Sequence, residues 1–355
     1  MPVRSLLDLT QMIPTVPVTS GNVLQPGTPF YVQGYAGGGG AVTPSITDGW
    51  FDITRPAVAG GESIRTVCAW KKLDDITWGS TSVGYLGIRL KSSMTGPANI
   101  PLITMCDTAG PANNTQDMLY RTDLPDGGVA GVEYYFEIGI DNVNKLFYRR
   151  INGNIRLADI PFTSTFNQLV GLQRLGIAIG YPPGVGMATT VALSYSFRDM
   201  YFVEKTGNTT TDTWLGPRKV VPITVDLVTA PWSASDGTDP KTVFNKPIVT
   251  ADDLLTPYAI TDDDSTEAQI KLNSQGVGNI TAIALSFNAR KPGGTAVNLR
   301  TKITSGGVDS TNVLTPLDTT MGKKAFYMSE TTPDGLPWTL ARLKAATLKV
   351  APVNA

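Results

Sequence analysis

The regular alternation of apolar and polar residues limits the fold of this chain more than any other feature. From 132 to 140, every even-numbered position carries Val, Tyr, Phe, Ile or Ile, and the odd-numbered positions between them carry Glu133, Tyr135, Glu137 and Gly139. A period of two places successive side chains on opposite faces of a β-strand. The same period recurs at 64–71 and 86–90. The sequence therefore predicts antiparallel sheets with one buried and one wetter face.

Turn signals connect these strands. Asp141-Asn142 follows the alternating stretch, and Asn152-Gly153 separates 145–150 from 155–157. Asn-Gly favours a type I′ turn, because both central residues of that turn need positive φ. Gly (36) and Pro (25) are abundant among the 355 residues, as expected for a turn-rich all-β protein. An antiparallel meander is predicted over 132–157.

We expect three parts along the chain. Residues 1–41 hold an apolar turn and then a series of prolines, which predicts an extended N-terminal arm. Residues 42–215 form the main β-domain, and a polar stretch over 206–217 marks the boundary before a smaller β-rich domain, 216–355. An extended arm has no core of its own, so it packs on its own domain or on a neighbouring subunit. The arm residues expected to dock are Leu6, Leu7, Leu9 and Ile13.

Two local signals predict details of these domains. The apolar face of the strand at 191–203 changes phase at Asp199-Met200, which predicts a bulge or a switch of sheet there. In the second domain, strands are expected near 220–225, 270, 280–289, 299–303 and 326–328. Thr339 is a suitable N-cap for one short helix over 340–346, and a closing strand follows at 348–350.

Composition excludes several classes of function. The chain has no His, so it has no Ser-His-Asp or Cys-His relay and lacks the commonest transition-metal ligand. Its net charge is −1 and the sequence shows no cluster of Lys and Arg, which argues against nucleic-acid and membrane partners. Cys68 and Cys106 form no CxxC motif, so we expect buried free thiols. We expect synthesis in the cytoplasm without a signal peptide, and no metal or cofactor.

Candidate catalytic and binding residues are few. Glu133 and Glu137 share a strand face, but positions i and i+4 lie about 13 Å apart, which exceeds the spacing of glycosidase carboxylates. A solvated sheet face is the simpler interpretation. The acidic group 262–264 lacks the spacing of a calcium loop and is expected to be a surface loop, and 74–75 and 141–142 are the other places where a metal or sugar could sit. Aromatic residues for stacking on sugar rings would be Trp50, Trp78 and Tyr181, although core packing is the alternative for each.

Two motifs carry a resemblance to a known family. They are Ser196-Phe197-Arg198-Asp199-Met200-Tyr201-Phe202 and Trp214-Leu215-Gly216-Pro217-Arg218-Lys219-Val220, and the Pro337-Trp338-Thr339 step supports them. Over roughly 50–355 the sequence resembles tailed-bacteriophage virion proteins in which a concanavalin-like (lectin or laminin-G-type) jelly roll precedes a small β-rich C-terminal domain. It departs from carbohydrate-binding relatives because it has no pair of calcium-ligating acids beside a sugar-stacking aromatic.

The resemblance implies a non-enzymatic structural component of a virion, in the tail, the baseplate or a tail-attached appendage. Its partners would be other virion proteins and copies of itself, as a trimer or hexamer ring. A host-surface glycan receptor that binds polysaccharide is the first alternative, and a capsid decoration protein is the second. A glycosidase that uses two carboxylates is the most remote.

Overall fold

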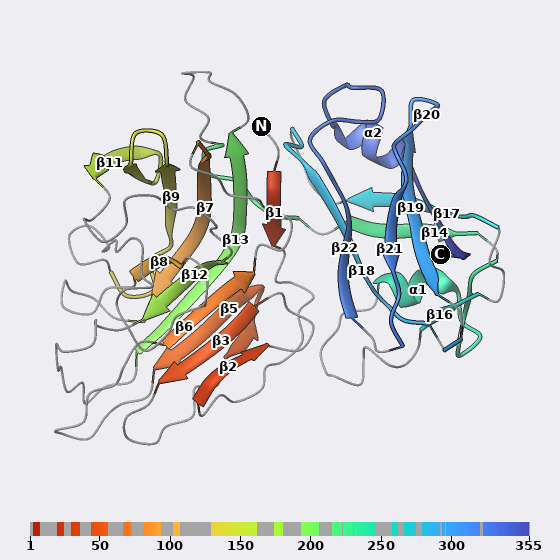
Figure 1. Cartoon of the computed structure of the whole chain (residues 1–355), viewed down its shortest axis with the longest axis horizontal. Coiled ribbons are helices and arrows are strands. Elements are labelled where there is room, and N and C mark those ends of the chain that lie inside the picture. The colour runs from red at the N-terminus through yellow and green to blue at the C-terminus, as the bar shows by residue number, and fades with distance from the viewer. Residues whose placement is uncertain are drawn as a thin grey trace. The chain divides into compact units, whose positions relative to one another are not determined.

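The computed structural model describes residues 3–7, 20–24, 30–35, 44–55, 67–72, 81–93, 102–106, 129–161, 174–179, 193–205, 215–221, 223–229, 231–245, 258–261, 266–274, 279–291, 293–294, 296–319 and 322–354. The chain divides into two compact units, Met1–Val220 and Val221–Ala355 (Figure 1). The division falls a few residues after the boundary expected at 215/216.

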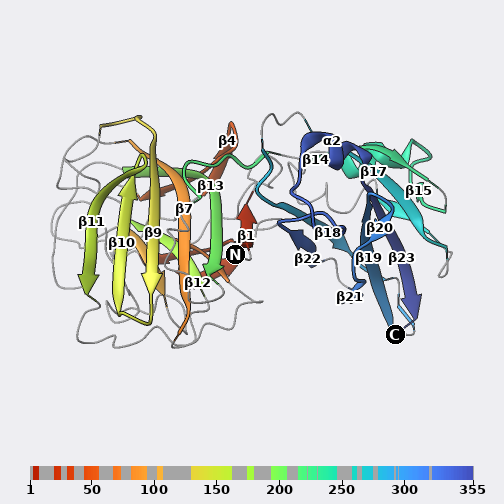
Figure 2. The ribbon, with the colours of Figure 1, turned by 90° about the horizontal axis from the view of Figure 1, so that it is seen from above.

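Unit 1 consists of two antiparallel sheets. The larger sheet has the order β11-β10-β9-β7-β13-β5-β4, with β1 also paired to β13, and Figure 2 shows β11, β10, β9, β7 and β13 side by side. Its strands are β1 (Val3–Leu7), β4 (Ser45–Thr47), β5 (Trp50–Arg55), β7 (Val83–Ser92), β9 (Tyr134–Asp141), β10 (Leu146–Ile151), β11 (Asn154–Pro161) and β13 (Leu193–Lys205). The smaller sheet has the order β2-β3-β6-β12-β8 and comprises β2 (Ser20–Leu24), β3 (Phe30–Tyr35), β6 (Val67–Lys72), β8 (Leu102–Cys106) and β12 (Arg174–Ile179).

The meander predicted from the alternating stretch is confirmed, since β9 pairs with β10 and β10 with β11, both antiparallel. The turn at Asn152-Gly153 has φ of 51° and 80°, as the Asn-Gly pair requires. One face of the larger sheet is a continuous apolar layer. Its members alternate along the strands and include Phe51, Ile53, Leu86, Ile88, Leu90, Phe136, Ile138, Ile140, Phe197 and Phe202, each at most 1% exposed.

The predicted bulge in β13 is also confirmed. Asp199 has φ of 52°, and the register between β13 and β7 shifts between Arg198 and Tyr201. β5 pairs with Leu193 to Phe197 before the bulge, whereas β1 pairs with Met200 to Val203 after it. One extra residue thus separates two halves of β13 that have different neighbours on the same side.

The expectation of a separate extended arm over 1–41 is wrong for the residues that the structure describes. β1 belongs to the larger sheet, and β2 and β3 form a hairpin in the smaller one. Leu6 and Leu7 lie on β1, opposite Tyr201 and Met200 of the same chain, while Leu9 and Ile13 lie outside the described residues. The apolar residues at the start of the chain have strand partners about two hundred positions later, which no local pattern reveals.

Cys68 and Cys106 lie on β6 and β8, on opposite sides of β12. Cys68 is opposite Ala178 and Cys106 is opposite Arg174, so an intervening strand and four residues along it separate the two cysteines. That offset alone is about 13 Å, well beyond the Cα separation of a disulfide. This backbone spacing is too wide for a disulfide between Cys68 and Cys106.

Unit 2 contains one main sheet with the order β14-β17-β23-β19-β20, to which β21 is added beside β19, and two smaller strand pairs. The strands are β14 (Ile223–Val228), β15 (Ser233–Ala234), β16 (Ala259–Ile260), β17 (Ala268–Ser274), β18 (Ile283–Ala289), β19 (Val297–Ser305), β20 (Val308–Asp309), β21 (Val313–Pro316), β22 (Gly322–Ser329) and β23 (Thr347–Asn354). The two helices are α1 (Pro240–Asn245) and α2 (Leu340–Ala345).

The core of unit 2 packs α2 and Trp338 against one face of its main sheet. Leu343 and Trp338 are each 1% exposed and lie in one cluster with Ile270, Leu299 and Leu348. The helix begins where the sequence predicts, because the Thr339 side chain accepts a hydrogen bond from the Arg342 N–H (3.2 Å). The closing strand is confirmed as β23, whereas α1 was not predicted.

Candidate functional site

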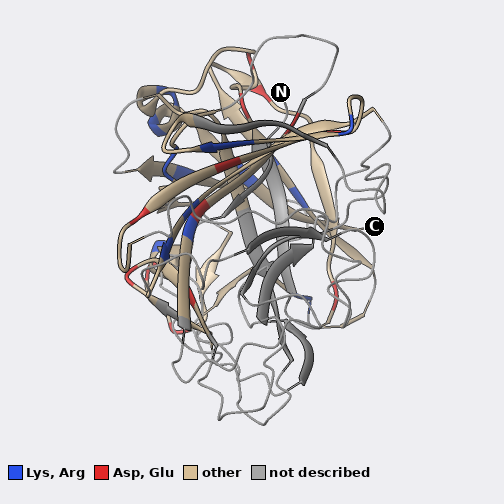
Figure 3. Ribbon diagram, turned by 90° about the vertical axis from the view of Figure 1, so that its left-hand side faces the viewer, with Lys and Arg blue, Asp and Glu red and all other residues tan. Residues whose placement is uncertain are grey.

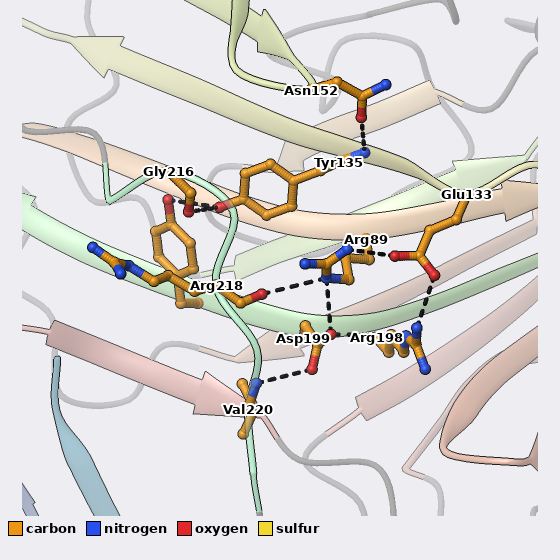
Figure 4. Close-up of polar contacts among 10 residues, drawn as sticks. Arg89, Glu133, Tyr135, Asn152, Arg198, Asp199, Gly216, Arg218 and Val220 are labelled. Atoms are coloured by element: carbon orange, nitrogen blue, oxygen red, sulfur yellow. Dashed lines mark hydrogen bonds and ion pairs between the residues drawn. The ribbon is translucent and has the colours of Figure 1, made fainter. Parts of the chain in front are cut away.

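The most extensive polar network in the described part of unit 1 holds the connecting segment, residues 215–220, which leads out of that unit. Its side chains lie on the face of the larger sheet opposite the apolar layer, and they come from β7, β9 and β13 (Figure 4). We call Arg89, Tyr135, Glu137, Asp199 and Tyr201 the clasp.

Glu137 is at one end of the clasp. The side chain is fully buried, and its Oε1 accepts hydrogen bonds from the Tyr201 hydroxyl (2.7 Å) and from the Gly216 N–H (2.8 Å). The Tyr135 hydroxyl donates to the Gly216 carbonyl oxygen (2.5 Å), so both backbone groups of Gly216 are bound. The other carboxylate oxygen, Oε2, has no hydrogen-bond partner among the described residues.

Gly87 makes room for the two tyrosines. It lies opposite both Glu137 and Tyr201, between β9 and β13. A Cβ at this position would lie 2.1 Å from Tyr201 Cε1 and 2.7 Å from the Tyr135 hydroxyl. The absence of a side chain therefore leaves room for the Tyr201 ring and the Tyr135 hydroxyl beside β7.

Asp199 is at the other end of the clasp. Its Oδ1 accepts from the Val220 N–H (2.9 Å), and Arg89 Nε lies 3.0 Å from its Oδ2 and donates to the Arg218 carbonyl oxygen (3.3 Å). The positive φ of the bulge turns this carboxylate toward the connecting segment. Burial raises the pKa of Asp199, although the hydrogen bond from Val220 and the charges of Arg198 and Arg89 oppose that shift.

Glu133 connects Arg89 of the clasp with the neighbouring Arg198. It forms ion pairs with Arg89 and with Arg198 Nη2 (2.7 Å), and Figure 4 shows it between the two guanidinium groups. Burial alone would raise the pKa of Glu133, but the hydrogen bonds and charges of Arg89 and Arg198 outweigh it and hold that pKa below its usual value. The acid is therefore a charged partner of two arginines.

The solvated face expected for Glu133 and Glu137 is therefore wrong at Glu137, which is 0% exposed. The covering residues come from 215–220, about eighty positions later in the chain, so the alternating pattern of β9 does not reveal them. Each glutamate has its own partners in a separate part of the network, and they do not face a common space as a pair of catalytic carboxylates would.

The tyrosines of the clasp are held in their neutral form. Burial, together with the charge of Glu137, raises the pKa of Tyr135 above its ordinary value. Burial and the neighbouring Tyr135 do the same for Tyr201. Both hydroxyls therefore act as hydrogen-bond donors at neutral pH, and neither is suited to act as a base.

Trp50 does not offer a face for stacking on a sugar. It is 7% exposed, with Lys91 Nζ 4.3 Å and the Arg198 guanidinium 4.2 Å from its ring centroid. The cations occupy the ring that a sugar would need, which corrects this candidate. Trp78 and Tyr181 lie outside the described residues, as do the acidic groups 74–75 and 262–264.

Asp141 has a structural role at the β9–β10 turn. Its two carboxylate oxygens accept from the Asn144 backbone N–H (2.9 Å) and from Asn144 Nδ2 (2.8 Å), and its side chain is 7% exposed. These contacts cap the turn. Within the described part of the chain, no group of three or more His, Cys, Asp and Glu side chains is placed to hold a metal ion.

Unit 2 has a second charged cluster on the face of its main sheet opposite the core. Glu267 and Asp309 pair there with Arg300, Lys302 and Lys349 at N–O distances of 2.9 to 4.0 Å. Hydrogen bonds from Thr304 and Lys302 lower the pKa of Asp309. Figure 3 likewise shows both acidic and basic positions on the described strands. No helix among the described residues is long and apolar enough to cross a membrane.

Comparison with known proteins gives only distant similarity. No protein-family model and no curated protein matches the sequence. Similar solved structures include the Lotus tetragonolobus seed lectin, with 11% identity and a TM-score of 0.34 over 58% of this chain and 100% of the lectin. Arcelin-5, a lectin-like defense protein from Phaseolus vulgaris, has 8% identity and a TM-score of 0.33 over 57% of this chain and 98% of its own.

Alginate lyase A1-II', a member of polysaccharide lyase family-7, has 14% identity and a TM-score of 0.31 over 45% of this chain and 82% of its own. At such TM-scores these similarities carry no argument about activity. The fold class rests on the sheets of the chain itself, which are antiparallel, as expected from the sequence.

Proposed function

We propose that this protein is a structural component of a bacteriophage virion, in the tail, the baseplate or a tail-attached appendage, and that it acts by packing against other subunits. The observation that carries the proposal is the clasp. The two motifs that resemble virion proteins meet there: Asp199 and Tyr201 of the clasp belong to 196–202, and the segment that the clasp holds, with Gly216 and Val220, belongs to 214–220.

The chemistry of the clasp supports a mechanical role. Its charged groups are paired with one another or with backbone groups of 215–220, and burial raises the pKa of both tyrosines. These contacts make the connecting segment part of unit 1 as far as Val220. Buried polar networks of this kind fix the local conformation of the chain. A fixed departure point for a second β-unit suits a protein that has to hold a position within a large assembly.

The test uses particles of the phage that encodes this chain, with a small tag after Ala355 and gold-labelled antibody visualised by electron microscopy. We expect labels at one defined place on the tail, in a constant number per particle. A matched strain with the same tag on an unrelated cytoplasmic phage protein measures background. Purified particles without the protein would overturn the proposal, and labels on the capsid surface would favour a decoration protein instead.

The glycan receptor is tested with the full purified chain on a glycan array and on host cells. The described part of the chain offers no exposed stacking aromatic among the three candidates, since Trp50 is covered by Lys91 and Arg198. If the protein is a structural component only, we expect no binding at millimolar sugar. Saturable binding that Trp78→Ala or Tyr181→Ala abolishes would establish the receptor role.

A further inference from the structure

The second half of β13 needs a neighbouring strand on the side away from β7. β7 pairs with β13 along both halves, whereas β5 ends its pairing at Phe197. β1 fills the remaining edge, with Leu7 opposite Met200, Leu6 opposite Tyr201 and Ser5 opposite Phe202. In the described part of the chain β13 is the only strand with which β1 pairs.

The residues that β1 lies against are deeply buried. Met200, Tyr201, Phe202 and Val203 are 2%, 1%, 0% and 0% exposed. Removal of β1 would leave the backbone N–H and C=O groups of one edge unpaired, next to this apolar segment. An uncovered edge of that kind readily accepts a strand from another chain. The position therefore requires a strand, but it does not require that the strand come from the same chain.

The segment that connects β1 to the rest of unit 1 would allow the strand beside β13 to come from the same chain or from another copy. β1 belongs to the larger sheet and β2 to the smaller one, and residues 8–19 link them. Twelve residues span at most about 40 Å when extended. A link of this length can reach a neighbouring copy as well as its own sheet.

We propose that β1 is exchanged between copies of this chain, so that in the assembled oligomer the β1 of one copy pairs with Met200–Val203 of the next. The inference rests on the proposed structural function, which supplies the neighbouring copies. The exchanged ladder has the same strand register as the ladder within one chain, so exchange requires no new backbone pairing. In a closed ring every copy gives one strand and receives one.

Exchange also assigns a role to the apolar residues at the start of the chain. Leu6 lies opposite Tyr201, the residue that donates to Glu137 in the clasp. The strand received from a neighbour would therefore complete the same part of β13 that holds the connecting segment. Assembly of the oligomer and attachment of residues 215–220 would then both depend on Met200–Val203 of β13.

The test uses single-cysteine chains in a Cys68→Ser/Cys106→Ser background whose fold is checked by circular dichroism. One chain carries Leu7→Cys and a second, with a different tag, carries Met200→Cys. These positions are directly opposite in the register, where Cβ atoms lie about 5 Å apart. The two chains are co-expressed, oxidised and run on a non-reducing gel. With random mixing, exchange predicts that up to about half of the Leu7→Cys chains are linked to a Met200→Cys chain.

Two controls make the result interpretable. Leu7→Cys paired with Asn154→Cys, an exposed position at the start of β11, should give no covalent dimer. A single chain with both Leu7→Cys and Met200→Cys shows that the bond can form at this register. If Met200→Cys fails to fold, Val3→Cys with Val203→Cys replaces the pair, since these positions are also opposite.

Failure of this inference can be told apart from failure of the proposed function by mass photometry of the same samples. Strand exchange is overturned if closed oligomers form with no disulfide between chains while the double variant forms its disulfide fully within one chain. That result leaves the structural role intact. A chain that stays monomeric and is absent from particles overturns the structural role. Covalent links between chains in proportion to the oligomer support exchange.

Discussion

At the scale of single residues, Glu137 is the position where a small change should have the largest effect. Replacement by Ala leaves the Gly216 N–H and the Tyr201 hydroxyl buried without an acceptor. We expect Glu137→Ala to destabilise unit 1 by about 2–4 kcal/mol, because buried donors that lose a charged acceptor are costly. Glu137→Gln keeps one acceptor oxygen and should cost about half as much. Urea denaturation measures both.

The control for this prediction is Tyr148→Phe. The Tyr148 hydroxyl donates to Asp141 at 3.3 Å in a half-buried turn outside the clasp, so its removal should cost less than about 1 kcal/mol. Limited proteolysis gives an independent readout, because release of residues 215–220 should make them cleavable in Glu137→Ala and not in Tyr148→Phe. Equal stability of all three variants would show that the clasp does not stabilise unit 1.

The acids of the network should respond to pH in opposite directions. Glu133 has a folded pKa below 4.5, so its contribution is present above pH 4.5 and is lost as pH falls through the folded pKa. Asp199 has a folded pKa above 3.8, so its contribution is present below pH 3.8 and is lost as pH rises through the folded pKa.

We therefore expect Glu133→Gln to flatten the loss of stability on the acid side, by no more than about 1 kcal/mol since Glu133 is partly exposed and screened. Asp199→Asn should reduce the loss of stability as pH rises above 3.8, because the amide still accepts from Val220. Melting temperatures between pH 2.5 and 7 measure both effects. A steeper acid limb in Glu133→Gln would contradict the assignment.

Residues whose role depends on neighbours in sequence were predictable, and residues whose role depends on distant segments were not. The phase change at Asp199 is visible in the sequence, because apolar residues switch from odd to even positions there. Its contact with Val220 is not, because nothing in the sequence indicates that residues 215–220 return to this sheet. Trp50 is hidden for the same reason, since the cations over its ring come from β7 and β13.

At the scale of elements, strands with strong alternation and turns with a defined chemistry were predicted well. β9, the Asn152-Gly153 turn and α2 are examples, and the sequence signal for each lies within about ten residues. β1 to β3 were missed because prolines and glycines surround them and because their strand partners lie far away in the sequence. β15, β16 and α1 fall between the strands expected near 220–225 and 270, where no further element was predicted.

The start of α2 provides a prediction at this scale. Thr339→Ala removes the acceptor for the Arg342 N–H and should destabilise unit 2 by about 1 kcal/mol. Thr339→Ser retains the hydroxyl and should lower the stability of unit 2 by only about a few tenths of a kcal/mol. Thermal unfolding followed by circular dichroism measures the difference. Equal losses in both variants would mean that the methyl group, and not the hydroxyl, is what matters at this position.

At the scale of the whole molecule, two compact units predict two unfolding events. The clasp belongs entirely to Met1–Val220 and the α2 cap entirely to Val221–Ala355. In scanning calorimetry we expect Glu137→Ala to lower one transition by several degrees and Thr339→Ala to lower the other by about 4 °C. A single transition that both variants shift equally would show that the units unfold as one.

Four hydrogen bonds from the clasp hold main-chain atoms of the connecting segment: the N–H and C=O of Gly216, the C=O of Arg218 and the N–H of Val220. Recognition of this kind does not depend on the side chains of the segment, apart from the positive φ of Gly216, which favours glycine. The attachment should therefore tolerate wide sequence variation between Pro217 and Lys219. A foreign domain fused after Val220 should consequently be attached to unit 1 through the same hydrogen bonds, so unit 1 can carry different second domains.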